Sequence, residues 1–431
     1  MTDHVNIRAL ILDTMLEVTK QEEYSHIAIR NTLEKYQYLP RQERKFYKRV
    51  CEGTLENLIL IDHVIQTYSG KSINKIKPVI RNILRAAVYE LYYMDSVPVS
   101  ATCNEAVKLA EKRGFRNLKG FVNGMLRNIA RKSKEVEYPN LSIRYSMPEW
   151  IINLWSQTYD TKDLENILKS FFMKCGTSIR VNTDQISVSK LKEELEKENI
   201  TVTENEMVPY GLFISNYDAI HKIKAFQSGL FYVQDTSSML VVEYAGIKDG
   251  DHVIDVCAAP GGKSLHIAEI LKGSGVVEAR DLTPYKVELM KENIKRLGLN
   301  NITADMMDAR MLDERSVEKA DVVIADLPCS GLGVIGKKPD IKYKMTEEKQ
   351  KDLILLQREI LHTVQSYVKP GGILMYSTCT ININENESNV AWFLKEHSQF
   401  SLDKQVQLLP DKGKNDGFFI ARLVKNSGKA E

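Results

Sequence analysis

Residues 252–271 read HVIDVCAAPGGKSLHIAEIL, a short apolar run followed by a glycine turn and then by a helical apolar stripe. The run at 252–256 is typical of a buried strand, and Ile267, Ile270 and Leu271 follow the 3.6-residue period of a helix. Glycines at such a turn let the backbone approach a ligand closely. A strand, a glycine turn and a helix in this order therefore predict the ligand-binding corner of an α/β sheet.

Further short apolar runs follow this corner at 275–279, 302–306, 321–325 and 372–376. Longer stretches with helical periodicity separate them, and that alternation is typical of a parallel sheet with helices on its faces. We therefore predict a Rossmann-like α/β domain over residues 231–431.

Asp281 ends the second apolar run, twenty residues after Gly261. A carboxylate at this place is suited to accept hydrogen bonds from both hydroxyls of a ribose. Two other nucleotide motifs fit less well. The P-loop pattern fails because Cys257 stands where a glycine is needed, and the literal G-x-G-x-x-G at 331–336 leads into Lys337-Lys338-Pro339, which cannot open a helix cleanly. The sequence thus predicts a nucleoside-bearing cofactor at 257–263.

Two cysteines follow the ends of two predicted strands: Cys329 in DLPCSG (326–331) and Cys379 in YSTCT (376–380). The carboxyl ends of parallel strands meet at one edge, where α/β folds place their chemistry. Two thiols beside a cofactor suggest methylation at C5 of a pyrimidine, a carbon that is not nucleophilic until a thiolate adds to C6. A second group near C5 could then remove its proton or assist release, while Asp326 would hold the N3/N4 edge of a cytosine.

The rest of the chain divides into two parts. Residues 1–135 show helical periodicity throughout and predict a helical bundle. Residues 1–140 carry 23 Lys and Arg against 16 Asp and Glu, a charge that suits either a polyanion partner or an ordinary solvated surface. Residues 141–230 predict a small α/β module, after a polar linker that ends in Pro139-Asn140.

Composition limits the class of protein. The 431 residues are 43% apolar and 27% charged, without an apolar run of membrane-spanning length or a signal-peptide pattern. The six cysteines lie far apart, so we expect reduced thiols, no metal site and a cytoplasmic location without membrane contact. Cys51, Cys103 and Cys175 are interpreted as small apolar core residues.

Together, DVCAAPGGK (255–263), DLPCSG (326–331), PDIK (339–342) and STC (377–379) closely resemble the RNA cytosine-C5 methyltransferases of the RsmB/NOP2/Sun family. DSVPVS (95–100), NEAVKLA (104–110) and KGFVNGML (119–126) resemble the NusB-type RNA-binding domain. The resemblance implies a class I S-adenosylmethionine methyltransferase domain, an all-α NusB-like N-terminal domain and an RRM-like middle module. The implied substrate is one specific cytosine of 16S rRNA, the small-subunit rRNA, modified by a monomeric enzyme.

The resemblance also assigns residues. It implies that S-adenosylmethionine is held by Asp281 at the ribose, by Asp308 near the adenine, by Asp326 between methyl donor and base, and by the loop residues Cys257, Ala258, Ala259, Pro260, Gly261, Gly262 and Lys263. Cys379 matches the nucleophile of the RNA enzymes and Cys329 the cysteine that helps to release product. In DNA cytosine methyltransferases the Pro-Cys cysteine is the nucleophile instead, which leaves the inverse assignment open.

Two departures from the family pattern concern RNA contacts. Gly336-Lys337 stands where the family often has two arginines, and Ile383-Asn-Glu-Asn386 replaces Pro-Glu-Glu-Asn. We expect Lys337, Lys338, Lys342 and Lys344 to contact RNA phosphates. Arg180, in Arg180-Val-Asn182, receives no role.

The alternatives from other classes of protein are a non-catalytic RNA-binding or antitermination factor and a dehydrogenase. Binding of S-adenosylmethionine would distinguish the methyltransferase from both.

Overall fold

The computed structural model describes residues 5–132, 136–173, 176–411 and 414–427. The chain forms two compact units, Met1–Phe172 with Ile335–Lys344 and Met173–Val334 with Met345–Glu431. The domain boundary predicted after residue 135 falls at 133–135, and Cys175 at 174–175, both outside the described residues. None of the helices in the described ranges has the length and apolar content needed to cross a bilayer.

The first unit is helical, as its sequence period predicts. Its core surrounds α5 (Pro78–Tyr93), whose expected stripe of Ile80, Ile83 and Leu84 is at most 3% exposed. Cys51 and Cys103 are buried in this core, which confirms their interpretation as apolar residues. The other helices are α1 (Ile7–Lys20), α2 (Ser25–Lys35), α3 (Arg41–Glu56), α4 (Leu58–Ser69), α6 (Val99–Lys112), α7 (Lys119–Lys132), α8 (Leu141–Arg144), α9 (Glu149–Trp155), α10 (Thr161–Ser170) and α16 (Ile341–Lys344).

The second unit begins with a four-stranded antiparallel sheet in the order β2-β3-β1-β4. Its central strand β1 is buried along most of its length, and the sheet packs against α11 through Leu191 and Leu195. This confirms the small α/β module. The elements are β1 (Thr177–Val181), α11 (Val188–Lys197), β2 (Thr201–Glu204), β3 (Gly211–Ser215), α12 (Lys224–Gln227) and β4 (Phe231–Val233).

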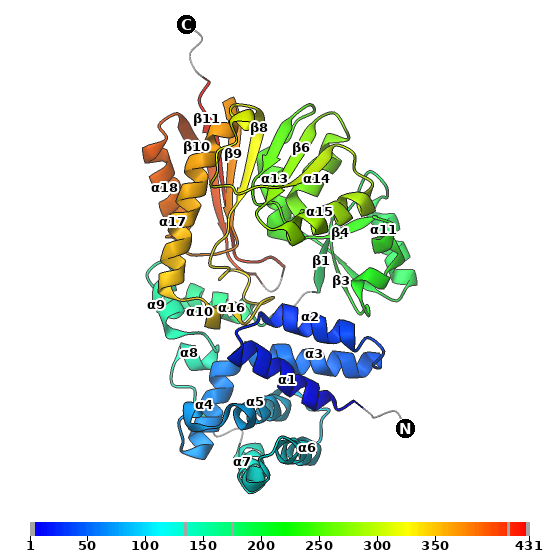
Figure 1. The fold of residues 1–431 in the computed structure, drawn as a ribbon, viewed down its shortest axis with the longest axis vertical. Helices are drawn as coiled ribbons and strands as arrows, with labels where there is room; N and C mark the ends of the chain where they lie inside the picture. The colour runs from blue at the N-terminus through cyan, green and yellow to red at the C-terminus, as the bar shows by residue number, and fades with distance from the viewer. Residues whose placement is uncertain (1–4, 133–135, 174–175, 412–413, 428–431) are drawn as a thin grey trace. The chain divides into compact units, whose positions relative to one another are not determined.

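A seven-stranded sheet follows, in the order β10-β11-β9-β8-β5-β6-β7 (Figure 1). The five strands expected from the apolar runs are present, and they pair in parallel, with the crossover at β5 that typifies doubly wound folds. The strands are β5 (His252–Asp255), β6 (Val276–Asp281), β7 (Ile302–Met306), β8 (Ala320–Asp326), β9 (Val368–Thr378), β10 (Phe400–Leu408) and β11 (Phe418–Lys425).

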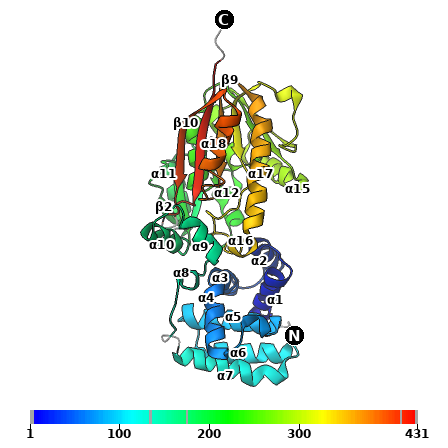
Figure 2. The same cartoon turned by 90° about the vertical axis from the view of Figure 1, so that its left-hand side faces the viewer.

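Helices cover both faces of this sheet, as Figures 1 and 2 show. Val253 and Val277 point to the face under α13, α14 and α15, whereas Ile254 and Val323 point to the face under α17 and α18. Alternating side chains of each strand thus enter two separate apolar layers. The helices are α13 (Thr236–Ala245), α14 (Gly262–Leu271), α15 (Pro284–Leu297), α17 (Glu347–Val364) and α18 (Glu387–Glu396).

The antiparallel pair β10 and β11 is absent from the sequence-based expectation, so the sheet is mixed rather than wholly parallel. β10 lies at the edge, and its residues 401–405 are exposed. An exposed edge strand carries no continuous apolar run, which is the signal that identified the inner strands.

Two lysines expected at RNA phosphates make contacts within the first unit, and one of them is buried. Lys342 is 2% exposed and donates to the backbone carbonyl of Glu56 over 2.9 Å, and burial lowers its pKa to about 7. Lys344 pairs with Asp340 at 3.0 Å. The expectation was therefore wrong for Lys342, because it considered charge without burial. Lys344 is partly exposed, and Lys337 and Lys338 are exposed.

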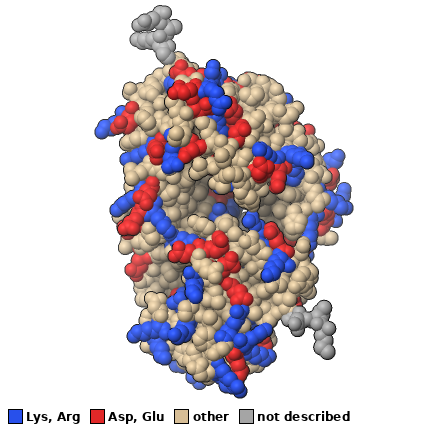
Figure 3. All heavy atoms as spheres, in the orientation of Figure 1, with Lys and Arg blue, Asp and Glu red and all other residues tan. Residues whose placement is uncertain are grey.

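Charged side chains of both signs are interspersed over the face seen in Figure 3. Groups of Lys and Arg lie among acidic side chains there, and no field of a single sign covers the visible face.

Candidate functional site

The predicted loop turns tightly between the end of β5 and the start of α14. Gly261 has φ of 103°, a left-handed conformation that favours glycine. The amide of Ala258 donates to the carbonyl of Arg280 over 2.8 Å, and the Tyr232 hydroxyl donates to the carbonyl of Pro260 over 3.0 Å. The loop is therefore held from β6 on one side and from β4 on the other.

Asp281 closes β6 beside this loop. Its carboxylate accepts from the amides of Ala259 and Thr283, each at 3.3 Å, and lies 3.3 Å from the Lys286 ammonium. Asp308 follows β7 and pairs with Arg310 at 2.6 Å, and the hydrogen bonds from Arg310 hold the pKa of Asp308 below its usual range. Asp281 pairs in register with Met306, so the ends of β6 and β7 bring both acids to one edge.

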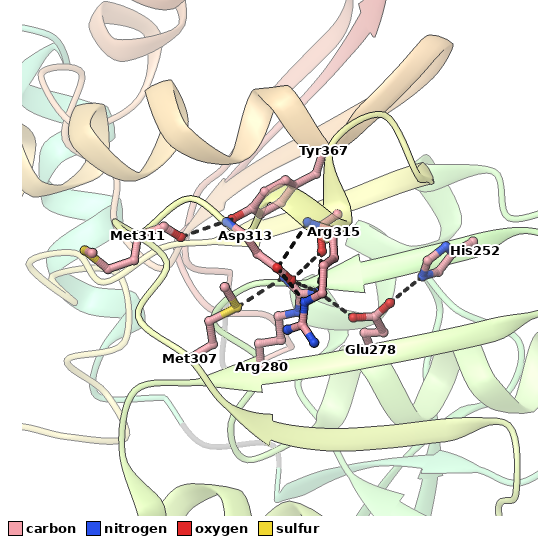
Figure 4. Close-up of polar contacts among 9 residues, drawn as sticks. His252, Glu278, Arg280, Met307, Met311, Asp313, Arg315 and Tyr367 are labelled. Carbon is pink, nitrogen blue, oxygen red and sulfur yellow. Dashed lines mark hydrogen bonds and ion pairs between the residues drawn. The ribbon is translucent and has the colours of Figure 1, made fainter.

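Arg280 connects β6 to the segment that follows Asp308. Its Nη2 donates to Glu278 over 2.5 Å and reaches Asp313 at 3.3 Å, while Nη1 lies 3.3 Å from the Met307 sulfur. Figure 4 shows these groups converging with Tyr367 above Arg280. The guanidinium is 7% exposed, so Arg280 is a buried charge that holds the 307–316 segment against the sheet.

Replacing Arg280 with methionine should lower the free energy of unfolding by about 3 kcal/mol, because it leaves the Asp313 carboxylate buried without this partner. Urea denaturation followed by circular dichroism would measure the change. Arg315→Met is the matched control, since Arg315 contacts the same Asp313 but is 90% exposed, and its loss should have little effect. Equal stability of Arg280→Met and wild type would contradict the interpretation.

A cavity of about 200 Å³ lies over the loop. Several predicted cofactor residues line it: Cys257, Ala258, Ala259, Pro260, Gly262, Lys263 and Asp326. Gly261, Asp281 and Asp308 lie outside its lining. The cavity is also lined by Tyr232, Val233, Gln234, Asp235 and Ser238, to which the sequence pattern assigned no role.

Lys263 and Asp326 form an ion pair of 2.5 Å at this wall. Ser377, opposite Asp326 in the β8–β9 register, donates to its other carboxylate oxygen over 2.7 Å. Burial is the largest single influence on the pKa of Lys263 and works to lower it, but the charge and hydrogen bond of Asp326, together with the charges of Asp255 and Cys379, raise the pKa overall. Lys263 is thus a fixed positive charge within reach of both Asp326 and Cys379.

The two predicted cysteines meet at the ends of β8 and β9. Their sulfurs lie 3.3 Å apart, although fifty residues separate them in the chain. The hydrogen bond with Cys379 and then burial raise the pKa of Cys329 well above its usual value. The Cys329 thiol therefore keeps its proton and can donate it toward Cys379.

Glu385, which sequence reasoning missed, ties the two cysteine loops together. This carboxylate is fully buried and accepts from the amide and the hydroxyl of Ser330, at 2.8 and 2.6 Å, and from the Asn382 amide at 2.8 Å. Asn386 bonds to Thr378 and Thr380 on either side of Cys379. The available signal was Glu385-Asn386, which matches the end of the family's Pro-Glu-Glu-Asn although the two residues before it differ.

The G-x-G-x-x-G at 331–336 is a packing element. A side chain on Gly333 would lie 1.9 Å from the carbonyl of Gly417 and 2.8 Å from that of Cys379. The segment opens no helix before α16. The glycines thus allow close approach of three backbone segments beside Cys379. This agrees with the poor fit of the motif to a dinucleotide site.

Two polar atoms at the cavity are buried without a hydrogen-bond partner among the described residues: Nε2 of Gln234 and Oδ1 of Asp255. Burial raises the pKa of Asp255 to about 7. An unpaired donor and an unpaired acceptor fit a ligand that carries both an anionic and a cationic group. The amino-acid part of S-adenosylmethionine is such a group, so the residues present fit this cofactor.

Comparisons with known proteins identify matching families and relatives. Family models match at 244–424 (16S rRNA methyltransferase RsmB/F), at 5–131 (NusB family) and at 147–221 (RsmF/B-like ferredoxin-like domain). A probable ribosomal RNA small subunit methyltransferase B of Bacillus subtilis is 34% identical over 97% of this chain and 99% of that protein. Its counterpart in Synechocystis is 30% identical over 98% of this chain and 100% of that protein.

Solved structures are also similar. The crystal structure of PH0851 matches with a TM-score of 0.82 and 30% identity, over 97% of this chain and 98% of that chain. NSun6 from Pyrococcus horikoshii, solved with SFG, an analogue of S-adenosylmethionine, matches with a TM-score of 0.59 and 25% identity, over 64% of this chain and 98% of that chain.

Proposed function

Because this chain belongs to the RsmB/F family of S-adenosylmethionine-dependent 16S rRNA methyltransferases, we propose that it methylates C5 of a cytosine through a covalent Cys379 adduct. Membership in the family makes the chain an enzyme acting on rRNA, so neither a non-catalytic RNA-binding factor nor a dehydrogenase is retained. The atom that is methylated, the nucleophile and the cofactor contacts are the subject of the proposal.

The observation that carries the proposal is the pair of sulfurs 3.3 Å apart at the ends of β8 and β9, the strands that carry Asp326 and Ser377. Ser377, two residues before Cys379, donates to the Asp326 carboxylate, which lines the cavity. Methylation of a ring nitrogen or of a ribose hydroxyl needs no thiol, because those atoms are nucleophilic themselves. C5 of cytosine is not, and a thiolate that adds to C6 makes it so.

The surroundings of the two sulfurs support Cys379 as the nucleophile. The raised pKa of Cys329, caused by the Cys379 hydrogen bond, burial and the Glu385 charge, keeps that sulfur protonated. A protonated Cys329 can stabilise a Cys379 thiolate by donating a hydrogen bond, and the nearby Lys263 charge does so as well. The reverse arrangement would place the negative sulfur beside buried Glu385.

The reaction then divides into two halves. The Cys379 thiolate bonds to C6 while Asp326 holds the N3/N4 edge and stabilises the charge that develops there. S-adenosylmethionine supplies an electrophilic methyl group on a sulfonium. Methyl transfer leaves S-adenosylhomocysteine. The Cys329 thiol then gives its proton to the departing Cys379 sulfur as the sulfur–C6 bond breaks, and the Cys329 thiolate so formed takes the C5 proton, which restores the ring.

The cofactor would be held along the loop from Cys257 to Lys263, with Asp281 at the ribose and Asp308 near the adenine. The exposed apolar side chains of Leu282 and Met306 flank these acids, and each is more than half exposed. Apolar surface beside two carboxylates suits a nucleoside, whose base is flat and whose ribose carries hydroxyls.

Saturation with S-adenosylhomocysteine at 100 times its Kd should stabilise the protein by about 2.7 kcal/mol, since a ligand that binds only the folded state contributes RT ln(1 + [L]/Kd). Thermal denaturation with and without the ligand measures this. NADH at the same concentration is the control and should give no shift. Absence of a shift with S-adenosylhomocysteine would contradict the proposed cofactor site.

We further propose three domains, 1–135, 141–230 and 231–431, and cytosine 967 as the target that family resemblance implies. The three family ranges at 5–131, 147–221 and 244–424 support this division. A base in structured RNA must be unstacked to reach such a site, at a cost of a few kcal/mol. Phosphate contacts from the basic helical part, and from exposed Lys337 and Lys338, would offset it.

Bisulfite sequencing of 16S rRNA treated with the purified protein tests the whole proposal. Unmodified transcript and S-adenosylmethionine should yield one protected cytosine, and omission of the cofactor should yield none. Methylation detected by mass spectrometry at a position that bisulfite does not report would show that C5 is not the acceptor.

A further inference from the structure

Gln234 lies at the wall of the proposed cofactor cavity, between the small sheet and α14. It follows β4 and is 5% exposed, and its backbone amide donates to the carbonyl of Ser178 on β1 over 3.2 Å. A side chain on Gly262 would lie 3.6 Å from the Gln234 amide carbon. Gln234 is therefore packed against the first residue of α14 and belongs structurally to the small sheet.

Arg180 of β1 determines which way this amide faces. Its Nε donates to Oε1 of Gln234 over 2.7 Å, and its Nη1 pairs with Glu269 of α14. Arginine carries only donors, so the amide oxygen must face Arg180 and the amide nitrogen must face away from it. Arg180 is 1% exposed, and this arrangement has little freedom to rearrange.

In this orientation the amide nitrogen of Gln234 is a donor without an acceptor among the described residues. Nε2 of Gln234 is buried without a partner among the described residues, and so is Oδ1 of Asp255 across the cavity lining. An unpaired buried donor is unfavourable unless a ligand completes it. One free donor and one free acceptor match a carboxylate and an ammonium group, the two charges of an amino acid.

We propose that Arg180 is a positioning residue, which orients Gln234 so that Nε2 donates to the carboxylate of the amino-acid part of S-adenosylmethionine. The inference rests on the proposed function, in that it assumes the cofactor in this cavity. Asp281 and Asp308, assigned to the ribose and adenine, lie outside the cavity lining, which leaves the amino-acid end for this wall. The small antiparallel sheet thus contributes to cofactor recognition as well as to packing.

Two ligands distinguish the loss of this contact from general damage to the cofactor site. S-adenosylhomocysteine carries the amino-acid carboxylate, whereas 5′-methylthioadenosine shares its nucleoside but lacks that group. Gln234→Met removes the amide at similar length and should weaken binding of S-adenosylhomocysteine by about 10- to 100-fold, the loss typical of a hydrogen bond to a charged group. Binding of 5′-methylthioadenosine, measured by the same calorimetric titration, should be unchanged.

Arg180→Lys tests the positioning step. Lysine keeps a positive charge for Glu269 but lacks the planar fork that holds both Gln234 and Glu269. It should weaken S-adenosylhomocysteine selectively, and Arg180→Lys added to Gln234→Met should cause no further loss, because Arg180 acts through Gln234. Arg296→Lys is the matched control: Arg296 is another arginine at this sheet, bonded to the Phe226 carbonyl, and its variant should bind both ligands as wild type does.

Equal affinity of Gln234→Met and wild type for S-adenosylhomocysteine would overturn the inference, as would a parallel loss of both ligands. If Arg180→Lys fails to fold, the affinities of Gln234→Met and wild type for the two ligands still test whether Gln234 contacts the carboxylate. Failure of the wild type to bind S-adenosylhomocysteine would instead refute the proposed cofactor site, and the inference with it. That failure is distinguishable because it appears before any substitution is made.

Discussion

Cys379→Ala should lower the rate of 16S rRNA methylation by a factor on the order of 10⁶, the scale of loss when a covalent nucleophile is removed. Without a sulfur at this position no bond to C6 forms, and C5 stays unable to accept a methyl group. Transfer of tritium from labelled S-adenosylmethionine to the RNA measures the rate. Cys379→Ser, which keeps the shape but not the thiolate, should be almost as inactive.

The partner cysteine should give the opposite phenotype. Cys329→Ala leaves the nucleophile in place but removes the thiol 3.3 Å away that assists its departure. A protein–RNA species should therefore accumulate as a retarded band on a denaturing gel, and Cys329→Ala with Cys379→Ala should abolish it. Cys103→Ala, in the helical core, is the control and should form no such band. Trapping in Cys379→Ala alone would reverse the two roles.

Asp326→Asn should reduce kcat by about 10²- to 10³-fold, the effect of losing one group that stabilises charge in the transition state. The asparagine keeps the size of the side chain but cannot hold a positive charge on the cytosine ring, and it leaves Lys263 without its 2.5 Å partner. Single-turnover kinetics at saturating cofactor isolates this step from cofactor binding.

Asp321→Asn is the matched control for that experiment. Asp321 lies on the same strand at its other end, where it pairs with Lys369, and its side chain is 32% exposed. We expect kcat of this variant to stay near the wild-type value. An Asp326→Asn enzyme with unchanged kcat would show that Asp326 only positions Lys263 or the cofactor.

The inner strands were predictable because burial on both faces leaves an uninterrupted apolar run. The run at 302–306 coincides with β7, and those at 321–325 and 372–376 lie within β8 and β9. β10 was not predictable, because an edge strand with exposed residues lacks that signal. The burial of Lys342 was not predictable either, because a charged side chain is expected in solvent whereas this one lies in the interior.

The candidate site was predictable where motif and strand end coincide, as at Cys257–Lys263, Asp326 and Cys379. Gln234 and Glu385 were not, because a single glutamine or glutamate carries no pattern of its own. Their significance depends on neighbours far along the chain: Arg180 for Gln234 and Ser330 for Glu385.

By itself the sequence determined which chemical groups stand at the ends of which strands, and hence the class of cofactor and the kind of reaction. Only the tertiary structure decided which of those groups meet and in what state. Hydrogen bonds and ion pairs act over about 3 Å, and residues fifty positions apart come within that range only through strand pairing. The hydrogen bond and the burial that raise the pKa of Cys329, and the burial that removes Lys342 from solvent, are likewise properties of packed neighbours.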